Sequence, residues 1–155
     1  MASESVPYLA RLRPLITAKL AVWGLVTRET SDLDLAKLYP DLNIVIAHYG
    51  NPWIVDATAV AARNPNVYID LSGLIEGECK AGDYLLKNRA YTNYIGMWMN
   101  YLANYEKFLF GTDWPLVDPA EYASVIKHIV PESEHEKIFY TNALKVFPLP
   151  KEMVG

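Results

Sequence analysis

The chain has 155 residues, of which 52% are hydrophobic and 21% are charged, with a formal net charge of −4. This composition predicts one folded domain of ordinary size and excludes an intrinsically disordered chain. Lysine and arginine are scattered without a basic run, so no nucleic-acid partner is expected. Cys79 is the only cysteine, which excludes an internal disulfide and indicates a cytoplasmic protein.

Residues 1–30 form an atypical N-terminal segment, in which residues 14–26 are largely apolar with Lys19 in the middle. This run is shorter than the roughly 20 residues that a membrane-spanning helix needs, so no membrane partner is expected. A secretory signal needs an uninterrupted apolar core, and Lys19 interrupts this one. The regular patterns of a folded domain begin at about residue 31.

From there, short apolar runs alternate with amphipathic stretches. Helices are predicted over residues 31–39, 53–63, 83–105, 118–130 and 133–147, and strands over residues 43–47, 66–70 and 107–110. Strict alternation of strands and helices predicts right-handed βαβ units and a parallel sheet. Three strands do not close on themselves, which leaves a small open α/β domain or part of a barrel.

Four of the predicted helices begin with capping patterns. Ser31-Asp-Leu-Asp34 fits a capping box that opens the helix at residues 31–39. Asn51 and Pro52 fit the N-cap and first turn of the helix at residues 53–63. Asp118 precedes a proline in the same way. Ser133-Glu-His-Glu136 fits a capping box that opens the last helix.

Two predicted strands end in residues that could carry chemistry. His48 follows the first strand, and Asp113 follows the third strand after Gly111 and Thr112. The carboxyl ends of parallel strands meet at the mouth of the sheet, where α/β enzymes hold their active sites. Histidine and aspartate serve both as ligands of a catalytic metal and as proton carriers. The structural alternatives are a histidine that only hydrogen-bonds in the core and an aspartate that only forms a turn.

Other residues receive weaker roles. Asp70 and Ser72, which end the middle strand, are expected mainly to organise a loop. A substrate pocket is expected to include Trp53, Ser72 and Trp114, although core packing is the commoner fate of tryptophan.

The other histidines and the lack of metal-binding motifs leave few candidate metal ligands in the sequence. His128 and His135 are expected to be solvated surface residues. No phosphate-binding loop, Cys-x-x-Cys pair, His-x-His pair or His-Glu-x-x-His motif occurs. A catalytic zinc takes three protein ligands, and His48 and Asp113 are only two candidates.

Four segments together resemble the amidohydrolase-related family in order and spacing: Ile44–Trp53, Asn66–Gly73, Phe110–Pro115 and Tyr140–Phe147. More narrowly, they resemble the branch of metal-dependent TIM-barrel hydrolases and decarboxylases that includes aminocarboxymuconate semialdehyde decarboxylase. The resemblance covers about residues 31–148 and leaves residues 149–155 as a C-terminal tail. It implies an α/β fold whose parallel βα units form about strands six to eight of a TIM-type barrel, incomplete on its own.

The resemblance also implies roles for the strand ends. His48 would end strand six and contact the metal-bound water or the substrate, and Asp113 would end strand eight as a metal ligand and proton acceptor. Both are therefore catalytic candidates and candidate metal ligands. Residues 70–73 would match strand seven, and the helix at Asn142 would be the last one, packed outside the barrel.

The implied function is a metal-dependent hydrolase that acts on a small organic substrate through metal-activated water. The implied cofactor is a divalent metal, expected to be zinc, in the complete family fold. Family members begin with a His-x-His pair that this chain lacks, so the alternative is a chain that binds no metal itself. A decarboxylase of the same family is a second alternative. The third is a truncated, non-catalytic remnant that associates with itself through exposed sheet edges.

Overall fold

A computed structural model describes residues 32–75, 77 and 80–147 of the chain. Its sheet consists of β1 (Ile44–Ile46), β2 (Val67–Asp70) and β3 (Phe108–Leu109), in the spatial order β1-β2-β3. All pairing is parallel, with Ile44 opposite Val67 and Ile69 opposite Phe108. The three strands lie where the sequence predicts them, and they run in the predicted direction.

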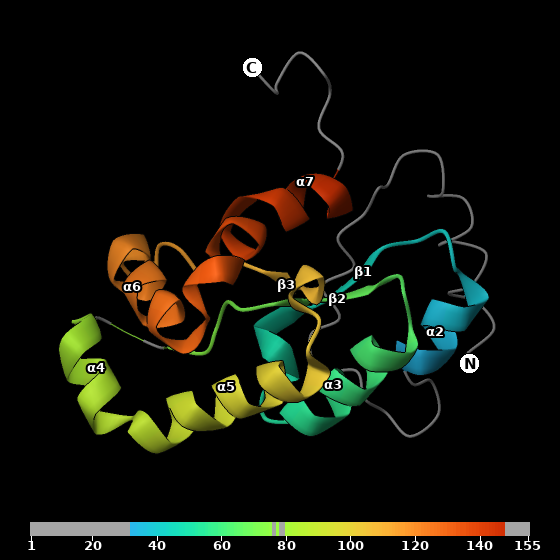
Figure 1. The fold of residues 1–155 in the computed structure, drawn as a ribbon. Helices are drawn as coiled ribbons and strands as arrows, with labels where there is room; N and C mark the ends of the chain where they lie inside the picture. The colour runs from blue at the N-terminus through green and yellow to red at the C-terminus, as the bar shows by residue number, and fades with distance from the viewer. Residues whose placement is uncertain (1–31, 76, 78–79, 148–155) are drawn as a thin grey trace, which may run out of the picture.

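Helices follow every strand (Figure 1). The α-helices are α2 (Asp32–Leu38), α3 (Ile54–Arg63), α4 (Ala81–Lys87), α5 (Arg89–Leu102), α6 (Pro119–Ile129) and α7 (Asn142–Val146). Short 3-10 turns form η1 (Ala47–Gly50), η2 (Tyr105–Lys107) and η3 (Glu132–Glu134), and η4 (Lys137–Thr141) is a π-helix. No helix in the described part of the chain is long and apolar enough to cross a membrane.

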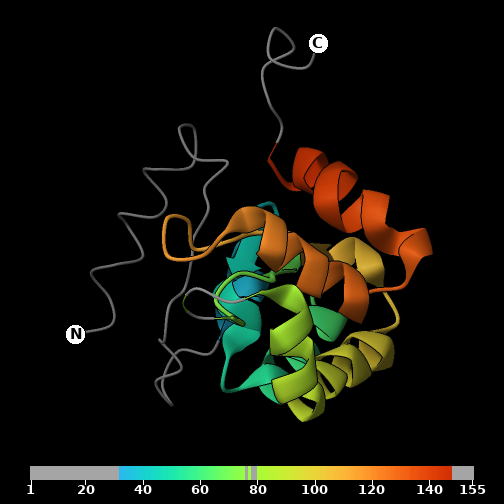
Figure 2. The same cartoon turned by 90° about the vertical axis from the view of Figure 1, so that its left-hand side faces the viewer.

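The sheet is covered on both faces because successive apolar side chains of each strand point to opposite faces. One face carries Ile46, Ile69 and Phe108 into the main core, which α3, α5 and α6 complete. The opposite face carries Val45 and Leu109, which pack against Val146 of α7. Figures 1 and 2 show α7 on one side of the sheet and α3 and α5 on the other.

The helix at Asn142, which the resemblance would place last and outside a barrel, is α7, and it lies on a different face of the sheet from α3. Val146 is fully buried against Val45 and Leu109, on the sheet face opposite to α3. The side chain of Asn43 fixes the end of α7 by donating a hydrogen bond to the carbonyl of Val146 (3.0 Å). Apolar side chains at the end of the helix therefore cover the second face of the sheet.

The single helix predicted over residues 83–105 is wrong, because the structure has two helices there. Asn88 ends α4: its backbone N–H (2.8 Å) and its side-chain amide (3.2 Å) both donate to the carbonyl of Tyr84. The start of α4 is capped from a distance, since Glu121 of α6 accepts a hydrogen bond from the N–H of Ala81 (2.8 Å) and pairs with Lys80 (2.8 Å). Polar contacts with α6 thus mark where this helix begins.

Of the four predicted capping patterns, the one at Ser31 lies outside the described residues, and one of the other three is confirmed. The carboxylate of Asp118 caps α6 by accepting hydrogen bonds from the N–H groups of Ala120 (2.8 Å) and Glu121 (3.1 Å). Asn51 does not cap α3, which begins only at Ile54. The N–H of Trp53 instead donates to the carbonyl of Gly50 (2.7 Å), so Asn51 and Pro52 belong to the preceding turn.

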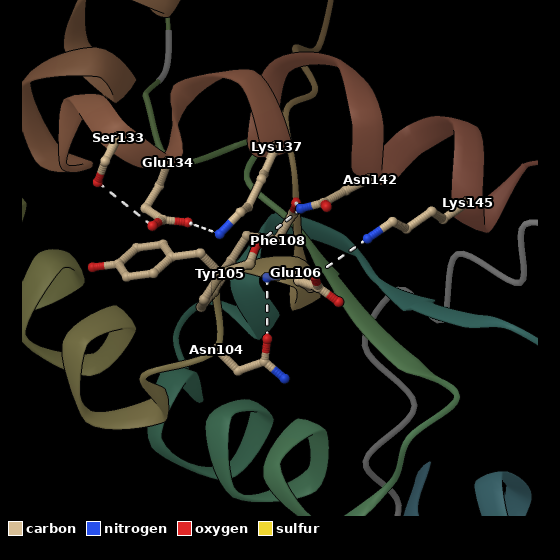
Figure 3. A network of polar contacts seen from close by, with 9 residues as sticks. All are labelled: Asn104, Tyr105, Glu106, Phe108, Ser133, Glu134, Lys137, Asn142 and Lys145. Atoms are coloured by element: carbon tan, nitrogen blue, oxygen red, sulfur yellow. Dashed lines mark hydrogen bonds and ion pairs between the residues drawn. The ribbon is translucent and has the colours of Figure 1, made fainter.

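The predicted capping box at Ser133 is also wrong. The hydroxyl of Ser133 lies 3.5 Å from the carboxylate of Glu134, and the chain continues into the π-helix η4 (Figure 3). The carbonyl of Ile138 in η4 accepts a hydrogen bond from the N–H of Phe110 (2.9 Å). The side chain of Asn142 donates to the carbonyls of Tyr105 and Phe108 (both 2.8 Å), so η4 and α7 are tied to the edge of β3.

Candidate active site

A strained turn places His48 at the carboxyl end of β1. His48, Tyr49 and Gly50 have φ values of 58°, 52° and 67°. This region costs a non-glycine residue roughly 1–2 kcal/mol, and surrounding structure must hold such residues in place. Tyr49 supplies part of that hold: it is completely buried, and its ring packs edge-on against Phe108.

The structure brings His48 and Asp113 together. Nε2 of His48 lies 3.4 Å from Oδ1 of Asp113, and the two side chains are 26% and 32% exposed. Asp113 occupies the loop after β3, where its carbonyl accepts a hydrogen bond from the N–H of Leu116 (2.7 Å). Two side chains from strands that are not neighbours in the sheet therefore meet at its carboxyl edge, within reach of one small ligand.

Two glycines bring the backbone close to the side chains at the carboxyl ends of β1 and β2. Any side chain at Gly73 would overlap the imidazole ring of His48, and any side chain at Gly111 would overlap the carboxylate of Asp70. Oδ1 of Asp70 also accepts a hydrogen bond from the N–H of Ser72 (2.8 Å). Asp70 thus organises the loop after β2, as the sequence predicts.

The loop after β2 is also bound by Tyr122 of α6. Its hydroxyl donates to the carbonyl of Leu71 (2.6 Å) and accepts from the N–H of Leu74 (3.0 Å). Sequence reasoning missed this residue, because a tyrosine one turn inside an amphipathic helix carries no local signal of such a contact. It also missed the contact of Gly73 with His48, although the glycine after Ser72 was a visible signal.

The three residues expected in a substrate pocket differ in exposure. Trp53 and Trp114 are 52% and 73% exposed, and each closely follows one of the two site residues in sequence. Ser72 is buried, in the loop that touches the imidazole ring. A shared pocket of these three residues stays a prediction.

His48 and Asp113 suit two positions of a metal site. Zinc–nitrogen and zinc–oxygen bonds of about 2.0–2.2 Å place two donors on a tetrahedral ion about 3.3–3.5 Å apart. The observed separation of 3.4 Å fits this spacing. A catalytic zinc takes three protein ligands. No group of three or more His, Cys, Asp or Glu side chains that could hold a metal occurs in residues 32–75, 77 and 80–147. Among the described residues, His48 and Asp113 therefore match the donor spacing of two positions of such a set.

The remaining histidines lie outside this site. His128 is exposed, as predicted. His135 is not a solvated surface residue: its Nε2 lies 3.0 Å from the carbonyl of Val130 and 3.2 Å from that of Lys127. It is half-buried because it covers the carboxyl end of α6 and packs edge-on against Phe139.

Comparison with known proteins identifies the family. A family model described as Amidohydrolase matches residues 30–149. The chain belongs to the amidohydrolase family. Among curated proteins, no sequence matches it.

Solved structures resemble this amidohydrolase in fold. An amidohydrolase from Burkholderia multivorans, crystallised with bound HEPES in one form and with bound zinc in another, is 19% identical with a TM-score of 0.50. The match covers 76% of this chain and 49% of that one. Amidohydrolase 2 from Bifidobacterium longum subsp. infantis is 23% identical with a TM-score of 0.49, over 76% and 45% of the two chains.

The chain spans about half the length of these structures. The Burkholderia match confirms the predicted fold class, in which parallel βα units form an incomplete part of a barrel. The narrower branch suggested by the sequence stays a prediction.

Proposed function

We propose that this amidohydrolase domain takes part in hydrolysis of a small organic substrate, with His48 and Asp113 as its catalytic residues. The observation that carries the proposal is the 3.4 Å approach of their side chains at the carboxyl edge of the sheet. Active sites of folds built from parallel βα units occupy this edge. Membership of the amidohydrolase family supports the reaction class.

Each residue has a defined part in the proposed reaction. As the oxygen of water bonds to the carbonyl carbon of the substrate, the carboxylate of Asp113 accepts the proton of that water. Nε2–H of His48 donates a hydrogen bond to the carbonyl oxygen, which becomes negatively charged. The proton on Asp113 then passes to the leaving group as its bond to carbon breaks, which restores the carboxylate.

His48 and Asp113 suit part of the ligand set that a divalent metal needs. When bound, zinc would lower the pKa of water to about 7 and so provide a nucleophile at neutral pH. His48 and Asp113 would hold the ion together with ligands outside the described residues. Nε2 of His48 would then bind the ion instead of donating to the carbonyl oxygen, and the ion would supply the positive charge beside that oxygen. The zinc bound in the Burkholderia structure supports zinc as the choice of metal.

The proposal predicts that hydrolysis depends on Asp113. The assay measures acid release from small amides, esters and lactones by the purified chain, with and without added Zn²⁺. Asp113→Asn keeps the size of the side chain but removes the proton acceptor, so kcat should fall about 100-fold or more. His48→Gln should lower kcat by a similar factor because it removes the oxyanion donor.

Asp83→Asn is the matched control, since Asp83 is an exposed carboxylate in the first turn of α4, and its activity should equal that of the wild type. Hydrolysis that survives Asp113→Asn unchanged would contradict the assignment. Release of CO₂ from small unsaturated or aromatic acids, without hydrolysis, would support the decarboxylase alternative. A chain inactive in both assays with Zn²⁺ present would support the non-catalytic alternative.

A further inference from the structure

We infer that Tyr122 is a positioning residue for His48, acting through the loop of residues 71–74 on which the imidazole ring rests. The inference rests on the proposed function in one respect, that His48 takes part in the reaction. Its geometry is independent of any reaction. Tyr122 lies on α6, more than 70 residues after His48 in the chain.

The first step is the contact between the loop and the ring. The positions that a Cβ atom would take at Gly73 overlap Cγ, Nδ1 and Cδ2 of His48, so the ring lies directly against the backbone of Gly73. Gly73 also has a φ of 63°, which other residues rarely adopt. The backbone of this one residue therefore limits where the ring can lie.

The second step is the hold of Tyr122 on both ends of that loop. Its hydroxyl donates to the carbonyl of Leu71 (2.6 Å) and accepts from the N–H of Leu74 (3.0 Å), so Gly73 lies between the two bonded residues. Tyr122 is 1% exposed, and no water competes for these bonds. Burial raises the pKa of Tyr122, which keeps its hydroxyl protonated and able to donate at neutral pH.

Two further side chains bind the same loop without replacing Tyr122. The hydroxyl of Tyr84 donates to the carbonyl of Leu74 (3.1 Å), and Asp70 accepts from the N–H of Ser72. These two hydrogen bonds do not involve the carbonyl of Leu71 or the N–H of Leu74. Loss of the Tyr122 hydroxyl would leave both of these buried groups unpaired, and the loop would shift to find new partners.

A shift of this loop would affect His48 because the backbone of His48 is itself strained. A residue with a φ of 58° keeps that conformation only while its surroundings hold it. Gly73 supports one side of the ring, and Asp113 lies 3.4 Å from Nε2. A shift of Gly73 would therefore change the distance and angle between His48 and Asp113.

Tyr122→Phe tests the inference, because it removes only the hydroxyl and keeps the ring that packs against Phe110. The readout is the NMR spectrum of the histidine rings, recorded with EDTA so that no metal is bound. His48→Gln assigns the signal of His48. We expect changed ring C–H shifts of His48 and a weakened cross-peak between that ring and the Hα protons of Gly73. The signals of His128 and His135 should not move.

Tyr105→Phe is the matched control. It removes a hydroxyl that donates to Asn100 (2.6 Å), away from the loop, and should leave the His48 signal unchanged. A folded Tyr122→Phe protein with wild-type His48 signals would overturn the inference. If this variant does not fold, measurements on the wild-type protein provide the test. Cross-peaks between Gly73 and the His48 ring, with slow exchange of the Leu74 amide proton, support the inference, and their absence overturns it.

The same variant separates this inference from the proposed function. If the chain hydrolyses a substrate, Tyr122→Phe should lower kcat by about tenfold or more with KM unchanged, because the reacting groups are misplaced. If the chain has no activity but the His48 signal moves, the positioning role stands and the proposed reaction fails. If activity is present but the His48 signal does not move, the positioning role fails alone.

Discussion

Buried tyrosines hold the loops that form the candidate site. Tyr49 lies beneath the strained turn that carries His48, with its hydroxyl 3.1 Å from Oγ1 of Thr58. Tyr122 bonds the loop after β2. Burial raises the pKa of Tyr49 to about 12, and it also raises the pKa of Tyr122. The folded state therefore favours the protonated form of both residues.

This predicts a loss of stability at alkaline pH. Tyrosines of the unfolded chain ionise near pH 10, whereas Tyr49 keeps its proton to about pH 12 when folded. The stabilisation is therefore complete below pH 10 and is lost between pH 10 and 12, by about 2–3 kcal/mol for Tyr49. Urea unfolding of the wild type and Tyr49→Phe at pH 9 to 11.5 measures it.

Tyr49→Phe should reduce the alkaline fall in the free energy of unfolding. Tyr101→Phe, at a 72% exposed position, should leave it as in the wild type. An equal fall in the wild type and Tyr49→Phe would contradict the account.

The sequence placed His48 and Asp113 after strands, and the structure brings their side chains together, but the sequence did not predict how they are held. His48 and Asp113 could be found because each follows an apolar strand, which is a local pattern. The positive φ values of His48 and Tyr49 could not be found, since neither residue type requires them. The contacts of Gly73 and Tyr122 also join residues far apart in the chain: Gly73 marks a turn, but no local pattern predicts which residue either of them contacts.

At the scale of elements, Lys107 ties the amino ends of β2 and β3 together. It is only 9% exposed, and its ammonium donates to the carbonyls of Asn64 (2.8 Å), Pro65 (2.8 Å) and Val67 (3.0 Å). Burial lowers the pKa of Lys107. A cavity of about 380 Å³ adjoins this end of the sheet, opposite to the candidate active site.

Lys107→Met should destabilise the protein by about 2–4 kcal/mol, because three carbonyls lose a charged donor while the apolar stem is kept. Lys87→Met is the matched control at an exposed position at the end of α4, where the change should be about 0.5 kcal/mol or less. Urea unfolding monitored by circular dichroism measures both. Equal stabilities of the two variants would show that the three hydrogen bonds contribute nothing.

Helix boundaries show why some elements could not be predicted. The order of strands and helices followed from hydrophobic periodicity and from the cap at Asp118. The start of α4 depends on Glu121, which lies 40 residues away from Ala81 in the chain. The π-helix η4 likewise depends on its contact with the edge of β3. Tertiary contacts decide these boundaries, and a capping pattern alone does not reveal them.

For the whole molecule, the sheet has helices on both faces and a strand neighbour on only one side of β1 and of β3 among the described residues. The N–H of Phe110 beside β3 is paired with η4. Association of two copies through the sheet edges stays a prediction, which sedimentation would test. The chain spans about half of the Burkholderia amidohydrolase, and His48 and Asp113, which follow β1 and β3, are of residue types that can ligate a metal.

The central claim is that His48 and Asp113 form one part of a metal-dependent site. Titration of the metal-free chain with Zn²⁺, followed through the NMR signals of its three histidine rings, tests it most directly. The account predicts that His48 responds at lower Zn²⁺ concentrations than His128 and His135, and that Asp113→Asn weakens this response about tenfold or more. A His48 signal that responds no earlier than the other two, or that is indifferent to Asp113→Asn, would contradict it.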